Sequence, residues 1–262
     1  MEILYFLVSF LSSIVGAICG IGGGVIIKPV LDMLQMGSAS TINFLSGCTV
    51  LSMSVYSVAR LLRSGEKRVD TVTGTPLAIG AAVGGLVGKA LFNLLRSQFA
   101  NGGVVSGVQA SILGVITVGT LIYTVLKARI STHRCTGKVF CLIVGLLLGI
   151  MSSFLGIGGG PINLVVLGFL FSMDSKTAAA NSLYIIVFSQ FANLAATVLG
   201  GDIPEFEPLA LILMVAGGVG GGIVGRMLNR KMDNRAVDKL FIALMSVIIL
   251  ICVFNAYCGF IG

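Results

Sequence analysis

Two glycine-rich runs contain the residues of this sequence best placed to do chemistry. Gly20–Gly24 and Gly156–Gly160 both read Gly-Ile-Gly-Gly-Gly, and their first residues are 136 positions apart. Each run interrupts a long apolar stretch, where every glycine costs a helix roughly 1 kcal/mol relative to alanine. Glycine also permits tight turns and lets the backbone approach a ligand closely. Breaks at matching points in two halves of an apolar chain are typical of a buried binding site.

A helix is expected to begin directly after each run, at Val25 and at Pro161. Proline suits a first helical position because its missing N–H would have no intrahelical partner there. The free N–H groups and the partial positive charge of a helix N-terminus favour an anion. Two such N-termini pointing to one central place would offset part of the large cost of burying a charge. The runs therefore predict a site for a small anion.

Neutral hydrogen-bonding side chains close to the runs in sequence are expected to replace water around the anion, although each could instead bond to a neighbouring helix. Lys28, with Asp32 four residues later, would balance the anion or couple to protons if it stays embedded. Alternatively it pairs with Asp32 or extends to the membrane surface. The predicted site residues are Gly22, Gly23, Gly24, Lys28, Asn43, Ser46, Gly158, Gly159, Gly160, Asn163, Asn181, Ser182 and Gln190.

The composition places these residues in a membrane protein. Hydrophobic residues make up 56% of the chain and charged residues 10%, against about 25% charged in soluble domains. Apolar runs of about twenty residues recur along the chain, each long enough to cross a bilayer. The sequence therefore predicts an all-α polytopic membrane protein. Met1–Ile3 lacks the positive charge of a cleaved signal peptide, so the first apolar run is expected to stay in the membrane.

Several other kinds of chemistry lack the residues they need. The only histidine, His133, lies in a basic stretch, and the six cysteines show no paired spacing, so zinc and triad sites are not expected. The net charge of +7 comes from short basic connections, which is a signal of topology and not of nucleic-acid binding. No enzyme activity, cofactor, metal or nucleic-acid partner is expected.

Both halves follow one plan, a glycine-broken helical hairpin followed by three transmembrane helices. At the offset of 136, Thr41 matches Thr177 and Ser46 matches Ser182 without a gap, which indicates an internal repeat. The predicted organisation is a first membrane repeat at 1–128, a basic cytoplasmic connector at 129–137 and a second membrane repeat at 138–262. Helical segments are expected at 3–20, 25–36, 39–62, 72–95, 105–126, 139–156, 161–173, 177–199, 208–228 and 240–260, with a basic loop at 226–239.

Charge placement decides between two topologies. If each glycine-broken run crossed the membrane once, the basic stretch at 226–239 would lie opposite the other basic loops, against the positive-inside bias. If each run doubles back, every Lys and Arg except Lys28, Lys89 and Arg96 falls on one side. The two halves then form inverted repeats with both chain ends outside, and their hairpins can meet near the midplane.

With these features in place, the sequence resembles the sulfite exporter TauE/SafE family of membrane proteins. The resemblance lies in Gly20–Gly24 followed by Pro29–Leu31, and in the shorter echo at Gly156–Gly160. It implies export or uptake of small sulfur-containing anions, such as sulfite or organosulfonates, across the cytoplasmic membrane of a prokaryote. The second half departs from the pattern with Val165 at the place of Pro29. The residues that fit the family are the two glycine runs, Pro29, Ser46 and Ser182.

Together these features predict a secondary transporter for a small sulfur oxyanion, with the lipid bilayer around it. Neither glycine run ends in the Gly-Lys-Ser/Thr of a nucleotide-binding loop, so an ion gradient, expected to be of protons, would supply the energy. An anion channel or facilitator is the alternative, because the same hairpins could line a pore. A membrane-embedded enzyme would need a convergent acid, base or metal set, for which the apolar segments hold almost no candidates. The oligomeric state is left open.

Overall fold

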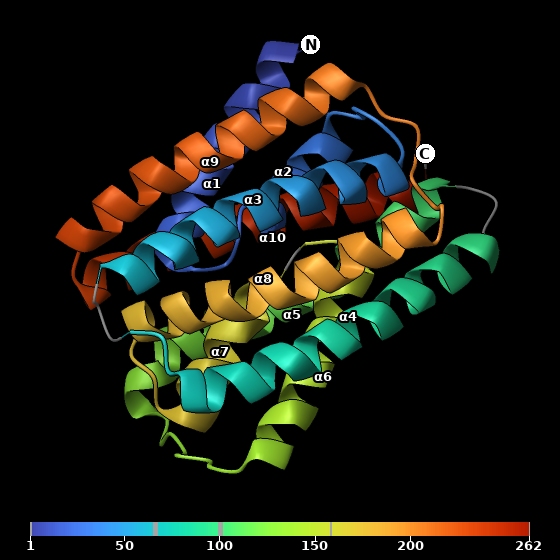
Figure 1. Ribbon diagram of the computed structural model, residues 1–262. Helices are drawn as coiled ribbons and strands as arrows, with labels where there is room; N and C mark the ends of the chain where they lie inside the picture. Colours follow the sequence, from blue (N-terminus) through green and yellow to red (C-terminus); the bar gives the residue numbers. More distant parts are fainter. Residues whose placement is uncertain (1, 65–67, 99–101, 158, 262) are drawn as a thin grey trace.

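The computed structural model describes residues 2–64, 68–98, 102–157 and 159–261, and in these ranges the chain contains helices and no strand (Figure 1). Eight of these helices are long and apolar enough to cross a membrane. The prediction of an all-α polytopic membrane protein is therefore confirmed. In chain order the elements are α1 (Glu2–Cys19), α2 (Gly24–Met33), α3 (Ala39–Arg63), α4 (Thr71–Gln98), α5 (Gly102–Leu126), the short 3-10 helix η1 (Lys127–Arg129), α6 (Lys138–Leu155), α7 (Pro161–Phe171), α8 (Ser175–Leu199), α9 (Pro208–Lys231) and α10 (Asn234–Ile261).

Several helices begin where the local sequence supplies a cap. The side chain of Ser38 accepts a hydrogen bond from the backbone N–H of Thr41 at the start of α3. The side chain of Asp174 does the same for Thr177 at the start of α8, and each bond satisfies an amide that has no partner within its helix. Pro161 stands at the first position of α7, as predicted.

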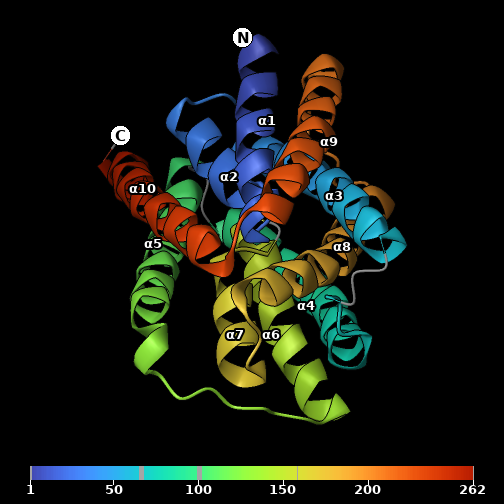
Figure 2. The ribbon, with the colours of Figure 1, turned by 90° about the vertical axis from the view of Figure 1, so that its left-hand side faces the viewer.

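The two glycine runs form the tips of two helical hairpins that enter from opposite ends of the molecule. In Figure 2, α1 descends from the N-terminus to the centre and α2 returns upward, whereas α6 climbs to the centre and α7 returns downward. Ile21 and Ile157, the second residues of the two runs, are both buried in one core cluster with Val25 and Leu155. The two tips therefore meet inside the protein.

The two halves of the chain are interleaved and do not pack as separate units. The most extensive helix contacts, α4 with α6 and α1 with α9, each join the first half to the second. Small residues bring these helices close together. A Cβ placed on Gly84 would lie 2.0 Å from the carbonyl oxygen of Leu146, and one on Gly225 would lie 2.4 Å from that of Ile14. The glycines on these helices therefore allow close packing of the backbones.

The helices also exchange partners between the halves. The contact of α4 with α6 has its counterpart in that of α9 with α1, α4–α8 has its counterpart in α9–α3, and α5–α7 has its counterpart in α10–α2. Two repeats related by a two-fold axis pack in this way, since each element of one half faces the matching elements of the other. The pairings agree with the predicted repeat, but its orientation in a membrane stays a prediction, as do the boundaries 1–128, 129–137 and 138–262.

One predicted loop is helical instead. α9 continues to Lys231 and α10 already begins at Asn234, so the expected basic loop at 226–239 shrinks to a two-residue connection. Lysine and arginine are good helix formers and are favourable at a helix C-terminus. α9 therefore continues beyond the end of its apolar segment. The return arms are shorter than predicted, because the chain adopts a positive φ of 53° at both Gln35 and Ser172, which ends α2 and α7.

Candidate functional site

The centre of the candidate site is the place where the two glycine runs touch. A Cβ built on Gly24 would lie 2.4 Å from the carbonyl oxygen of Ile157, and one built on Gly160 would lie 3.3 Å from Cγ2 of Val25. A residue larger than glycine at position 24 must displace the opposite backbone. The first turns of α2 and α7, whose leading N–H groups have no intrahelical partner, are therefore brought together at this contact.

The predicted site glycines serve this contact in different ways. Gly159 and Gly160 have φ angles of 130° and 98°, and Gly22 has a φ of 70°, values that side-chain-bearing residues rarely adopt. Gly23 has a helical φ of −64°, and a Cβ there would lie 3.0 Å from Oγ of Ser13, so space and not backbone conformation favours glycine at this position. Gly158 lies outside the described residues.

Asn163 and Ser182 lie together beside the second tip. Nδ2 of Asn163 is 3.4 Å from Oγ of Ser182 and 3.2 Å from the place where a Cβ on Gly159 would stand. Both side chains are buried, and Oδ1 of Asn163 has no hydrogen-bond partner among the described residues. A buried polar atom without a partner is costly, so this place suits a polar ligand.

Asn43 reaches the same tip from α3. Its Oδ1 atom stands 2.2 Å from the place where a Cβ on Gly156 would be, and that oxygen is unpaired within the described ranges. Ser46, one turn further along α3, is fully buried with an unpaired Oγ. Gln190 faces the neighbouring Gly47, with Oε1 3.1 Å from a Cβ placed there. Asn43 and Ser46 therefore lie on α3, and Gln190 faces the same helix from α8.

Lys28 pairs with Asp32, which was one of the alternatives expected for it. Its Nζ lies 3.2 Å from Oδ2 of Asp32, and the two side chains are 4% and 9% exposed. The pair lies on α2 where α2 packs on α10, and Asn255 of α10 donates a hydrogen bond of 2.9 Å to the carbonyl of Pro29. The positive charge of Lys28 is thus balanced within the protein, while a part in transport stays a prediction.

Asn181 is a predicted site residue whose side-chain amide is fully used in hydrogen bonds to the backbone. Its Oδ1 accepts a hydrogen bond of 3.0 Å from the backbone N–H of Asp70. Its Nδ2 donates bonds of 2.9 Å to the carbonyl oxygens of Arg68 and Thr177. The amide is therefore engaged in holding the connection before α4 against α8.

A cavity of about 380 Å³, which we call the α4 vestibule, leads from the surface to the second tip. Asp202 lines it together with Lys89 and Asn193, and its inner residues are Asn43, Ser153 and Gly156. Ser153 is 4% exposed and its Oγ has no partner in the part of the chain described. The second tip is thus accessible from one side through a passage whose lining includes these polar side chains.

The matching region of the other half, which we call the α9 cleft, is almost closed, with a volume of about 40 Å³. Ala17 and Ala179 line it, and Ala179 packs against Gly20 of the first tip. Nη1 of Arg226 donates a hydrogen bond of 3.0 Å to the carbonyl of Ser57, and Nδ2 of Asn229 donates one of 2.6 Å to that of Ile18. These bonds tie α9 to α3 and α1 across the cleft.

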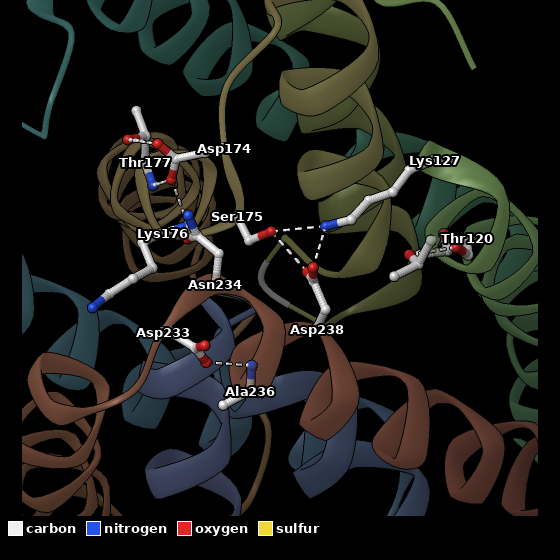
Figure 3. Close-up of polar contacts among 11 residues, drawn as sticks. Thr120, Lys127, Asp174, Ser175, Lys176, Thr177, Asp233, Asn234, Ala236 and Asp238 are labelled. Carbon is white, nitrogen blue, oxygen red and sulfur yellow. Dashed lines mark hydrogen bonds and ion pairs between the residues drawn. The ribbon is translucent and has the colours of Figure 1, made fainter. Parts of the chain in front are cut away.

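A third cavity, of about 400 Å³, lies between α5, α7, α8 and α10. Figure 3 shows Lys127, Ser175 and Asp238 pointing toward one another beside it. Lys127 donates a hydrogen bond of 2.9 Å to Oγ of Ser175 and forms an ion pair with Asp238. Ser175 in turn donates one of 2.7 Å to Asp238. All three polar groups are paired, so this cluster joins the ends of three helices.

Two residues near the second tip were missed by the sequence reasoning. Ser153 lies one turn before the second glycine run. In the predicted topology Lys89 is one of the three basic residues that do not lie on the basic side of the membrane. The available signal was the position of Lys89, a cation within an apolar, glycine-rich stretch of the sequence. Among the described residues, no group of three His, Cys, Asp or Glu side chains lies close enough to hold a metal.

In the described residues, eight helices of membrane-spanning length, two of which (α1 and α6) are the first arms of the glycine-tipped hairpins, define a multi-pass membrane protein. The model of the family described as "Sulfite exporter TauE/SafE" matches residues 5–251. The chain therefore belongs to the TauE/SafE family, and the family resemblance stated from the sequence is confirmed. Together with the relatives that follow, this membership makes it a membrane transporter with a small-molecule substrate.

Three relatives carry the description "probable membrane transporter protein". The chain is 23% identical over 261 residues to YunE of Bacillus subtilis (strain 168), which covers 90% of this chain and 91% of that protein. It is 23% identical over 201 residues to MJ0441 of Methanocaldococcus jannaschii, covering 73% and 70%. It is also 31% identical over 111 residues to MamO of Magnetospirillum gryphiswaldense, covering 40% of this chain but only 18% of that protein. No solved structure matches the chain.

Proposed function

We propose that this protein is a secondary transporter that moves a small sulfur-containing anion, of the sulfite or organosulfonate class, across the cytoplasmic membrane of a prokaryote. The observation that carries the proposal is the contact of the two glycine tips next to buried, unpaired polar atoms. The anion would bind near the midplane, beside the first turns of α2 and α7. Both chain ends would lie outside, with the basic helix ends in the cytoplasm.

The chemistry around the tips suits a singly or doubly charged oxyanion. Helix N-termini supply N–H groups and partial positive charge, and the Ser46 hydroxyl has no protein partner among the described residues. The amides of Asn43 and Asn163, whose Oδ1 atoms are unpaired among the described residues, can present either their nitrogen or their oxygen, since the two orientations are nearly equivalent in shape. Such a site binds oxygen atoms on a compact anion without burying a permanent positive charge beside it.

The difference between the two access routes supports a carrier over an anion channel. A pore needs a continuous path, whereas the α4 vestibule has a volume of about 380 Å³ and the α9 cleft only about 40 Å³. A carrier alternates between two such states around one site. Protons are the proposed coupling ion, and the buried Lys28–Asp32 pair is the proposed place of coupling.

Uptake by purified protein in liposomes tests this function. We expect saturable uptake of sulfite or sulfoacetate that responds to an imposed pH gradient and shows counterflow. Asn163→Ala should raise the substrate concentration for half-maximal uptake about fivefold, the value of roughly one hydrogen bond. Uptake of none of these anions would refute the substrate class, and a flux that does not saturate would favour the channel.

A further inference from the structure

The two side chains of the Lys89–Asp202 ion pair lie at different depths in the α4 vestibule. The side chain of Lys89 is only 13% exposed, whereas that of Asp202 is 55% exposed. The positive charge therefore lies at depth and the negative charge lies at the mouth. Beyond Lys89 the same cavity is lined by Asn43 and by the buried Ser153, each with a side-chain oxygen unpaired among the described residues.

The pairing of Lys89 with Asp202 is loose. Nζ of Lys89 and Nδ2 of Asn93 both lie 3.4 Å from the same oxygen, Oδ2 of Asp202. Tight charge-assisted bonds measure about 2.7–2.9 Å, and ion pairs with an exposed partner contribute little. An anion that enters the vestibule can therefore replace the carboxylate at the ammonium group.

We propose that Lys89 is the first binding site for the transported anion in the α4 vestibule, and that Asp202 is a tethered competitor that occupies Lys89 while the vestibule is empty. An anion held by Lys89 lies in the same cavity as Asn43, Ser153 and the second tip. Its oxygens accept hydrogen bonds from an ammonium group, an amide and a hydroxyl. The proposal rests on the proposed anion transport and adds where the anion binds first.

Thiol labelling tests the lysine without relying on transport. Thr197 lines the vestibule and bonds to the carbonyl of Asn193 in its own helix, so Thr197→Cys places a thiol there with little disturbance. Two methanethiosulfonate reagents are compared, one carrying an anionic sulfonate and one carrying a cationic trimethylammonium group. Mass spectrometry gives each rate at position 197, and the exposed Cys258 serves as the internal reference for the reagents.

The expected result is a faster reaction of the anionic reagent, with a ratio of anionic to cationic rates that Lys89→Met lowers about six- to tenfold. A unit charge about 6–8 Å away in water changes the local concentration of each reagent about threefold, in opposite senses. Lys89→Arg should preserve the ratio. Lys127→Met, which removes a paired cation beside a different cavity, should also leave it unchanged. A ratio that ignores Lys89→Met, or that follows Lys127→Met equally, overturns the proposal.

Protection by sulfoacetate tests the competitor. The concentration that halves labelling at position 197 should fall about two- to fivefold with Asp202→Asn, the range expected for an ion pair with an exposed partner. In the Lys89→Met background Asp202→Asn should have no effect, since the two residues act on the same anion. An equal gain without Lys89, or no protection at all, would overturn the competitor role.

The two proposals can fail separately. A charge preference that depends on Lys89 in a protein without anion flux would keep the vestibule site and refute the transport proposal. Normal flux in Lys89→Met, with an unchanged labelling ratio, would refute the vestibule site alone.

Discussion

The α4 vestibule and the α9 cleft are built from matching segments, yet only the vestibule is open. Lys89 follows Gly88 in α4 as Arg226 follows Gly225 in α9. Both cavities end at a glycine tip, at Gly156 for the vestibule and, through Ala179, at Gly20 for the cleft. Their volumes are nevertheless about 380 and 40 Å³, so similar helix arrangements give two different degrees of access.

The side chains account for this difference. Asn43 and Ser153 at the inner end of the vestibule correspond, at the offset of 136, to Ala179 and Ala17 in the cleft. The guanidinium of Arg226 donates a hydrogen bond to a backbone carbonyl of α3, whereas Lys89 pairs with an exposed carboxylate. A polar inner end keeps one route open to a ligand, while alanines and an arginine bonded to backbone close the other. On the proposed carrier mechanism, opening the α9 cleft would require breaking the hydrogen bonds that Arg226 and Asn229 of α9 form across it.

The largest effect is expected at the contact that both routes share. Gly24→Ala would place a Cβ 2.4 Å from the carbonyl oxygen of Ile157, and backbone on both sides prevents easy relaxation. A displacement of about 1 Å at a working site can cost about a hundredfold in rate, so we expect transport to fall by at least an order of magnitude. Uptake in liposomes measures this loss.

Gly119→Ala is the matched control for this substitution, since a Cβ there meets nothing within 4 Å. It should keep full uptake and unchanged thermal stability. Equal uptake by Gly24→Ala and Gly119→Ala would show that transport does not need the close contact of the two tips. The α4 vestibule and the α9 cleft would then not lead to one shared site.

A smaller effect is expected from opening the α9 cleft. Arg226→Met removes the hydrogen bond of 3.0 Å to the carbonyl of Ser57, and bonds to charged groups are worth about 1.5–3 kcal/mol. The population with an open cleft should therefore rise about tenfold or more, which thiol labelling of Ser57→Cys from the basic side would detect. Arg235→Met, at an exposed position on α10, should not change the labelling. Labelling that stays equally slow after Arg226→Met would mean that other contacts close the cleft.

The hairpins could be predicted from the sequence because their signal is local and duplicated. Glycine runs that break two apolar stretches at a constant offset specify a turn in each half, and charge placement favours the doubled-back form over a single crossing. Side-chain roles could not be predicted in the same way. The hydroxyls of Thr49 and Ser52, which are near the predicted site residues in sequence, bond to the carbonyls of Leu45 and Cys48 in their own helix.

Asn181 and Lys89 show the same limit from opposite directions. Asn181 is adjacent to Ser182 in sequence, but on a helix neighbouring residues face different directions, and its amide bonds to the backbone of Arg68 and Asp70. Lys89 is far in sequence from both glycine runs and reaches the second tip's cavity only because α4 packs on α6. Contacts between halves have no signature in a single sequence, so the walls of the two cavities could not be derived from it.

The smallest effects should separate two asparagines that the sequence treats alike. Asn43 lines the open vestibule with an oxygen unpaired among the described residues, so Asn43→Ala removes a ligand contact without breaking a recorded side-chain bond. Sulfoacetate affinity should fall about fivefold, the value of roughly one hydrogen bond, and the melting temperature should hold, since removing an unpaired buried polar group is close to neutral. Asn181→Ala breaks three hydrogen bonds to the backbone and should cost about 1–3 kcal/mol of stability with unchanged affinity.

Thermal denaturation with and without sulfoacetate measures both quantities in one experiment. If Asn43→Ala and Asn181→Ala lost affinity and stability in the same proportion, Asn43 would stabilise the fold and not bind the anion specifically. The difference between the α4 vestibule and the α9 cleft would then be structural and not functional.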